Sequence, residues 1–288
     1  HTLGSLNIKN STAAKCTLTS GVTTIDGEGA ANKAINIEGS NGVTNFAHGS
    51  GTVTITHDGV SDIKADGVTL ALNHLIINHA SANINLKGIL TVAGNLTITA
   101  GELDTDSSNY ALTVTGLCHV GGGILTGNAS AISMGGLLVG SAGKYNATSG
   151  TTTITTEDVT GYAWDVNGTD SFDNNDGTVL FDLPASMDSH IRTGQADGAN
   201  SFHNLTVLLD AAARWLILRP NAGTAMTIEG NLTISEGVVY ATNVAHTLTV
   251  DGHVVVSTGG TLGHVDHTGA YTFQSLTVAA GSPAGVFI

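Results

Sequence analysis

Charged side chains are the scarcest class in this chain. They make up only 11% of its 288 residues, under half the usual share for a soluble domain. The hydrophobic fraction of 41% is nevertheless too high for a disordered tract, and it is distributed by alternation rather than in blocks. Solubility must therefore come from Thr, Ser, Asn and Gly. This is typical of strand-rich repeat proteins, in which Thr fits the pleated surface and Asn or Gly fits the corners.

Basic residues are especially few, with 9 Lys and Arg against 23 Asp and Glu, for a net charge of −14. Such a chain has no basic stripe for nucleic acid or for an anionic membrane. No apolar run approaches the roughly 18 residues of a transmembrane helix. We find no recognisable signal peptide, and because the chain opens on His1 we expect a processed product or a segment of a longer polypeptide.

Only two cysteines are present, Cys16 and Cys118, so a disulfide framework is not implied. In the repeat described next, Cys118 aligns with Val254. We therefore expect Cys118 to be a small buried hydrophobic residue.

Two nested repeats dominate the sequence. Gly94 and Gly116 are 22 residues apart, as are Gly230 and Gly252, and each is followed closely by an alternating Thr/apolar stretch. The second pair follows the first by 136 residues. At a longer period, Leu3–Ile8 recurs as Met134–Val139 and again as Phe273–Val278. The matches keep their order while their offsets drift, as loop insertions in a duplicated unit would produce.

The chain is therefore predicted to contain repeat module 1 at 1–133, repeat module 2 at 134–272, and the first strand of a third module at 273–288. A 22-residue unit with two short strands cannot bury its own apolar face and must stack on its neighbours. This predicts an all-β fold, a β-solenoid (parallel β-helix) of about thirteen turns and about 60 Å. The alternative is a tandem array of β-sandwiches. We predict strand and loop for Leu208–Leu218.

The blocks GNLTITAGELD (94–104) and GNLTISEGVVY (230–240) resemble β-solenoid surface repeats in bacterial adhesin and autotransporter passenger regions. The longer unit, with SGTTTITTED, GYAWD, NNDGTVLFD and SFHNLTV, is similar to repeats in tail-fibre and virion proteins of marine bacteriophages. The resemblance implies a fibrous, extracellular or virion-surface structural role. It transfers no catalytic residue to this chain.

Catalysis of the kind that some β-helix proteins perform on polysaccharides would need clustered carboxylates on one face of adjacent turns. In this sequence the acidic residues are scattered among turns, and the two modules share no acidic pair. We therefore expect no enzyme activity and no catalytic residue.

The strongest acidic cluster is formed by Asp170, Asp173 and Asp176. Oxygen-rich loops of this kind suit Ca²⁺, which is therefore the one candidate ion. No other cofactor is expected. A solvated Asx-rich turn is the preferred interpretation, because the spacing is not that of an EF-hand and the matching loop at 42–51 carries His48 and no acid. The His264–His267 stretch is expected to be an exposed turn rather than a zinc site.

Packing at a corner is the preferred interpretation of Trp164. Trp164, with Tyr162, is also the candidate for a glycan-binding surface, because aromatic faces stack on sugars. The sequons at Asn95, Asn204 and Asn231 are explained by the start of an Asn-Leu-Thr strand, so glycosylation is not inferred.

Together these features predict a structural, non-catalytic segment of an extracellular fibre, either a virion appendage or a cell-surface adhesin. Its expected partners are identical copies or the continuation of the same fibre, and possible host-surface glycans, with no nucleic acid and no membrane insertion. The alternatives are a glycan-binding adhesin module and a polysaccharide-degrading β-helix enzyme.

Overall fold

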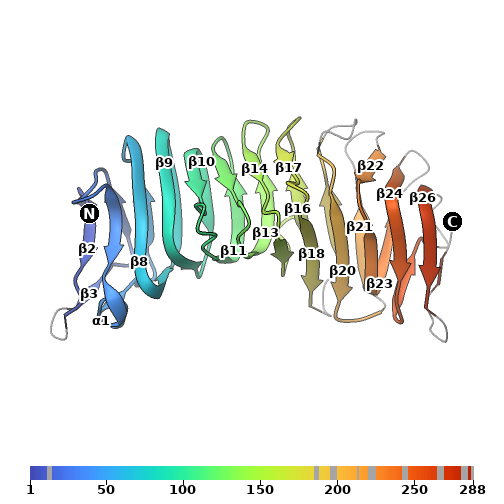
Figure 1. Cartoon of the computed structure of the whole chain (residues 1–288), viewed down its shortest axis with the longest axis horizontal. Helices are drawn as coiled ribbons and strands as arrows, with labels where there is room; N and C mark the ends of the chain where they lie inside the picture. The colour runs from blue at the N-terminus through green and yellow to red at the C-terminus, as the bar shows by residue number, and fades with distance from the viewer. Residues whose placement is uncertain are drawn as a thin grey trace.

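The computed structural model describes residues 1–11, 15–184, 188–194, 200–212, 214–219, 225–241, 246–264, 269–279 and 285–286. They form a β-solenoid of about 11 turns, drawn out as a rod with the two termini at opposite ends (Figure 1). Strands of successive turns pair in parallel, as Leu96 with Cys118 and Val179 with Leu205. The solenoid prediction is therefore confirmed, and the alternative of β-sandwiches, which are antiparallel, is excluded.

Each complete turn of the rod passes through three faces, which we name A, B and C in chain order. The strands confined to face A are β1 (Thr2–Leu3), β4 (Val22–Ile25), β7 (Thr52–Ile55), β16 (Tyr162–Val166), β19 (Ser189–Arg192), β21 (Trp215–Leu218), β25 (Gly260–Leu262) and β27 (Gly285–Val286). Those confined to face B are β2 (Leu6–Ile8), β5 (Lys33–Ile37), β12 (Ile124–Thr126), β14 (Lys144–Asn146), β17 (Phe172–Asp173) and β22 (Ala225–Ile228). Those confined to face C are β15 (Thr151–Ile154), β18 (Thr178–Leu183) and β20 (Asn204–Leu209).

The remaining strands of the large sheet bend around one or two corners of the rod. These are β8 (Gly59–Leu72), β9 (His74–Val92), β10 (Leu96–Asp104), β11 (Leu112–Val120), β13 (Ile132–Val139), β23 (Leu232–Ala241), β24 (Thr247–Val256) and β26 (Ala270–Val278). Near the N-terminus, β3 (Cys16–Thr17) and β6 (Phe46–Ala47) form a separate two-stranded sheet beside a short helix, α1 (Gly39–Thr44), which the sequence analysis missed.

Glycine-rich corners repeat from turn to turn as the 22-residue period predicts. The Gly116 N–H donates to the Gly94 carbonyl (2.9 Å), and the Gly252 N–H donates to the Gly230 carbonyl (3.0 Å). A Cβ at Gly116 would lie 2.8 Å from the Gly94 carbonyl oxygen, so the close approach of the two backbones requires glycine.

The turns are longer and richer in strands than predicted. Leu96 and Cys118, which are partners in neighbouring turns, are 22 residues apart, but Thr151 and Thr178 are 27 apart and Val22 and Thr52 are 30 apart. Longer loops reduce the number of turns to about 11 instead of about thirteen. The third strand of a turn went unnoticed because it can follow the preceding strand around a corner with no loop between them, as at Gly101 (φ 83°) within β10.

The core is a continuous column of inward-facing apolar side chains. Alternation places one residue in two inward, and the inward residues of neighbouring turns cover one another. Cys118 lies in this column, and burial raises the pKa of its thiol to about 12, which confirms its expected role as a small buried hydrophobic residue. A cluster of aromatic rings fills the middle of the rod, comprising Tyr145, Trp164, Phe172, Phe181 and Phe202.

The two sequence modules are rotated by one face relative to each other. One stack on face A joins the module 1 residues Ile25, Ile55, Ile77 and Ile98. Their sequence equivalents in module 2 form a stack on face C, which joins Ile154, Phe181, Val207 and Ile234. Likewise Leu6 lies on face B, its equivalent Leu137 on face A, and the third copy, Leu276, on face C.

A module therefore spans a whole number of turns plus two thirds of a turn. The predicted boundaries at 133/134 and 272/273 fall inside strands β13 and β26, so the apolar column runs through both. Strand β20 ends at Leu209 and β21 begins at Trp215, so the described residues of Leu208–Leu218 form strand and loop, as predicted. In the described residues, none of the helices is long and apolar enough to span a membrane.

Candidate functional site

In the described residues, the parallel pairing of face B is interrupted between strand β17 and the 200–202 segment. Strand β17 contains only two residues, and in the next turn the described residues of face B pair through the single bridge between Phe202 and Ile228. The buried side chain of Asn200 takes over the missing backbone contacts. Its Oδ1 accepts from the Phe172 N–H (2.9 Å), and its Nδ2 donates to the carbonyls of Gly168 (2.8 Å) and Thr193 (2.9 Å).

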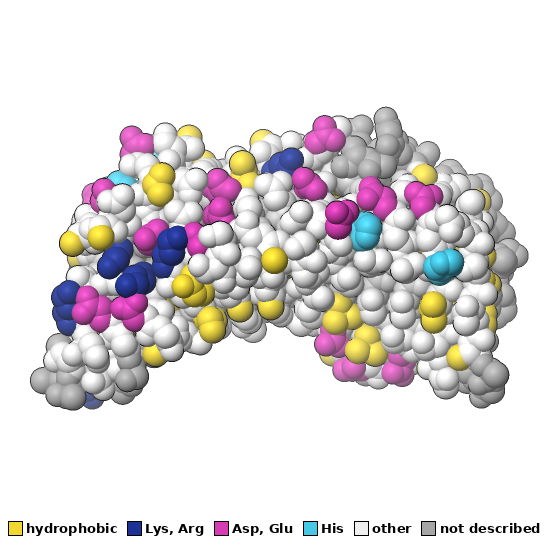
Figure 2. All heavy atoms as spheres, viewed as in Figure 1, with side chains coloured by type: hydrophobic (Ala, Val, Ile, Leu, Met, Phe, Trp, Pro, Cys, Tyr) yellow, Lys and Arg dark blue, Asp and Glu magenta, His cyan; other side chains and the backbone are white. Residues whose placement is uncertain are grey.

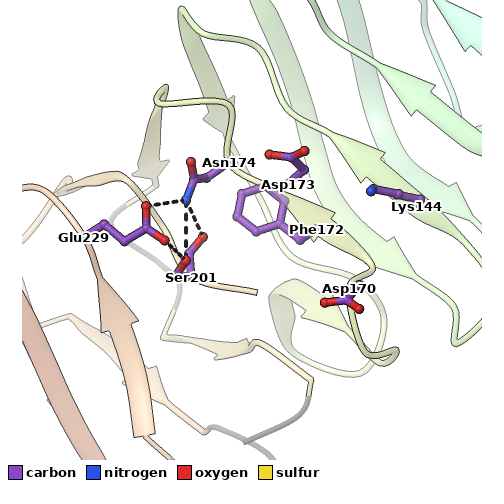
Figure 3. Close-up of a pocket in the computed structure, with 7 residues that line it drawn as sticks. All are labelled: Lys144, Asp170, Phe172, Asp173, Asn174, Ser201 and Glu229. Atoms are coloured by element: carbon purple, nitrogen blue, oxygen red, sulfur yellow. Dashed lines mark hydrogen bonds between the residues drawn. The ribbon is translucent and has the colours of Figure 1, made fainter. Parts of the chain in front are cut away.

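This interruption leaves an open groove of about 530 Å³ on the surface (Figure 3). The groove crosses four successive turns of the rod, from β14 through β17 and the 200–202 segment to the end of β22. It is lined mainly by polar and charged side chains, namely Lys144, Asp170, Asp173, Asn174, Ser201 and Glu229, with the ring of Phe172 beneath them.

One wall of the groove is held in place by hydrogen bonds. Ser201 Oγ donates to Glu229 Oε1, and Asn174 Nδ2 donates to Glu229 Oε2 (3.2 Å) and to the Ser201 carbonyl (3.2 Å). Both carboxylate oxygens of Glu229 are thereby committed as acceptors. These hydrogen bonds hold the three side chains against one another.

The opposite wall consists of Lys144, Asp170 and Asp173, whose charged groups surround the Phe172 ring in Figure 3. Asp170 has a positive φ of 53°, a conformation that Asn and Asp tolerate better than most residues. Among the described residues none of these three forms an ion pair within 4.0 Å. Their charges therefore face the groove and solvent.

The structure separates the three aspartates that were considered as calcium ligands. Asp170 and Asp173 line the groove, but Asp176 lies at the neighbouring corner, where its Oδ1 is 3.5 Å from Nδ1 of His203. In the described part of the chain, no three acidic, His or Cys side chains are arranged to hold a metal ion. Asx-type hydrogen bonds, such as Asp173 Oδ1 accepting from the Asn175 N–H (3.2 Å), support the turn interpretation.

The two residues proposed for glycan stacking are not among those that line the groove. Trp164 is fully buried, with its ring 4.8 Å from that of Phe172 and 5.1 Å from that of Phe202, so neither indole face is open to a sugar. Tyr162 is half-buried on face A, and the guanidinium of Arg192 lies 4.7 Å from the centre of its ring. The structure therefore favours the packing interpretation of Trp164.

The three Asn-Leu-Thr sequences have a common structural role. Asn95 Oδ1 accepts from the Leu117 N–H (3.0 Å) in the next turn, Asn204 Oδ1 from the Asn231 N–H (3.0 Å), and Asn231 Oδ1 from the His253 N–H (2.9 Å). These asparagines link neighbouring turns at the corners. Of the predicted histidine turn only His264 is described, with its ring 5.3 Å from that of Trp215; residues 265–267 lie outside the described residues.

Charge is unevenly distributed along the rod. Figure 2 shows lysine side chains gathered over the N-terminal turns and mostly acidic side chains further along the same view. The lysines are interleaved with acids, as in the Lys9–Glu38 pair (2.7 Å) and the Lys87–Asp106 pair, which lowers the pKa of Asp106. The groove lies outside this neutralised region.

No protein-family model, no curated protein and no solved structure matches this chain. The functional argument therefore rests on the geometry of the rod and of its groove. Sequence reasoning missed Lys144, Ser201 and Glu229 as groove residues. They come from different turns and line one groove only because the pairing of face B is interrupted, and no local sequence motif predicts that interruption.

Proposed function

We propose that this chain is a structural, non-catalytic segment of an extracellular fibre, either a virion appendage or a cell-surface adhesin, and that it needs no cofactor. The observation that carries the proposal is the continuous apolar column, in which each turn depends on its neighbours for burial. Such a column makes a stiff spacer, and its Thr, Asn and Gly surface supplies solubility without many charges.

The proposed partners are identical copies or the continuation of the same fibre, joined through strand edges. In the described residues, β26 is paired on one side by β24, and its Leu276 is only partly buried while Val278 is 41% exposed. An unpaired edge with apolar side chains is a template for another strand. The double change Leu276→Lys with Val278→Lys is therefore expected to reduce self-association, because charges would cap the apolar edge.

Sedimentation velocity across a wide concentration range measures this effect. We expect unmodified chains to form larger species as concentration rises and the double variant to stay at the mass of one chain. The matched control is Thr277→Lys, which lies between the two positions and faces outward. A chain that stays monomeric at every concentration, or an association that the double variant leaves unchanged, would contradict assembly through this edge.

The non-catalytic part of the proposal has a separate test. Asp170 and Asp173 are both exposed to solvent. Each oxygen of Glu229 accepts one hydrogen bond from a neighbouring groove residue. We expect no release of reducing ends from polysaccharides; release that Glu229→Gln abolishes would assign catalysis to the groove.

A further inference from the structure

We infer that the groove on face B is a binding site for a linear oligosaccharide of neutral sugars. This goes beyond a purely mechanical role, because it gives the rod a specific ligand. The inference rests on the shape of the groove, on the chemistry of its two walls and on its charge.

The shape fits a chain of several sugars rather than a single compact ligand. A volume of about 530 Å³ lies within the range of small-ligand sites. The groove crosses four turns, and three intervals of about 4.8 Å give it a length of about 14 Å along the rod. It is open to solvent rather than enclosed.

The chemistry of the walls fits hydroxyl groups. The carboxylates of Asp170 and Asp173 accept hydrogen bonds and the ammonium of Lys144 donates them, and all three lie on one wall. A sugar hydroxyl both donates and accepts, so neighbouring hydroxyls can satisfy this mixed set. The wall of Glu229, Ser201 and Asn174 is fixed by its own hydrogen bonds, which reduces the entropy lost on binding.

The charge of the groove selects against ionic ligands. Three carboxylates against one ammonium, on a chain of net charge −14, repel phosphates, uronic acids and sialic acids. Lys144 stands in the same wall and disfavours an ammonium placed between Asp170 and Asp173. Uncharged sugars are repelled neither by the three carboxylates nor by the ammonium of Lys144.

The test is an array of linear oligosaccharides with neutral, amino and acidic members, probed with the full chain and followed by calorimetric titration of the best binder. We expect retention of a neutral member and none of the acidic ones. The variant Asp170→Asn with Asp173→Asn keeps shape and turn geometry but removes both charges. It should weaken binding by about tenfold or more, since the hydrogen bonds that each substituted side chain makes to the sugar are no longer charge-assisted.

The matched control is Asp251→Asn, an exposed carboxylate outside the groove that should leave affinity unchanged. The inference fails if no neutral oligosaccharide is retained, if the double variant binds as tightly as the unmodified chain, or if spermidine competes as well as the best sugar. Binding with no reducing-end release leaves the non-catalytic proposal intact. Binding accompanied by cleavage overturns that proposal while supporting the site.

Discussion

Trp164→Ala is expected to lower the free energy of unfolding by about 3–5 kcal/mol, the range for truncating a large buried aromatic side chain. The indole is fully buried and contacts the rings of Tyr145, Phe172, Phe181 and Phe202. Because stacked turns are rigid, the cavity can collapse only partly. Neighbouring turns should therefore lose packing on both sides of the substitution.

Denaturant unfolding followed by circular dichroism measures the loss. The matched control is Trp215→Ala, which removes a half-buried indole near Tyr240 and His264 and should cost less than half as much. If Trp164→Ala were tolerated with little loss of stability while binding of sugars disappeared, Trp164 would have to be a ligand-stacking residue and its buried placement would be wrong.

Asn200→Ala is expected to lower the free energy of unfolding by about 2–4 kcal/mol, because it leaves several buried backbone groups without partners. The side chain, only 4% exposed, now satisfies the Phe172 N–H and the carbonyls of Gly168 and Thr193. Alanine can replace none of these contacts. Asn200→Asp retains an acceptor for Phe172 but places a carboxylate against two carbonyls, so it should be at least as damaging.

The control for this prediction is Asn167→Ala. Asn167 is half-buried, and its Nδ2 donates over 3.4 Å to the Val139 carbonyl, a long contact whose loss should cost little. Thermal unfolding of Asn200→Ala, Asn200→Asp and Asn167→Ala gives the order of their stabilities directly. Equal stabilities for Asn200→Ala and Asn167→Ala would contradict the role of Asn200 in replacing the missing face B strand.

The solenoid could be predicted because its determinants are local and repeated. Alternating residues such as those of 96–98 fix which side chains point inward, and the recurring glycines at 94 and 116 fix where neighbouring backbones meet. Repetition at 22 residues then implies stacking. The same signals do not reveal how many faces a turn has, because β10 is one strand that bends at Gly101 (φ 83°) and joins two faces.

The rotation of the modules could not be predicted from the repeat. Ile25 on face A and its equivalent Ile154 on face C occupy similar apolar stacks, so the same sequence pattern is compatible with either face. Which face a segment joins depends on the summed lengths of all preceding loops. No single residue encodes it.

The groove was only partly accessible to sequence reasoning. The acidic stretch at 170–176 attracted attention, and two of its three aspartates do line the groove. Their partners Ser201 and Glu229 come from later turns, and their approach depends on the buried Asn200 and on the length of the loops between. Packing was the preferred interpretation of Trp164, but sugar stacking stayed open beside it because burial in an aromatic cluster cannot be read from its neighbours in the sequence.

The most direct test of the account is disulfide cross-linking of chosen pairs in a chain carrying Cys16→Ser and Cys118→Ala. Ser133 and Thr153 are partners in neighbouring turns of face C, so the pair Ser133→Cys with Thr153→Cys should oxidise to an intrachain disulfide. Leu138 and Thr153 lie on different faces, A and C, and the pair Leu138→Cys with Thr153→Cys should remain reduced. Cross-linking of the second pair and not of the first would contradict both the three-faced stack and the rotation of its modules.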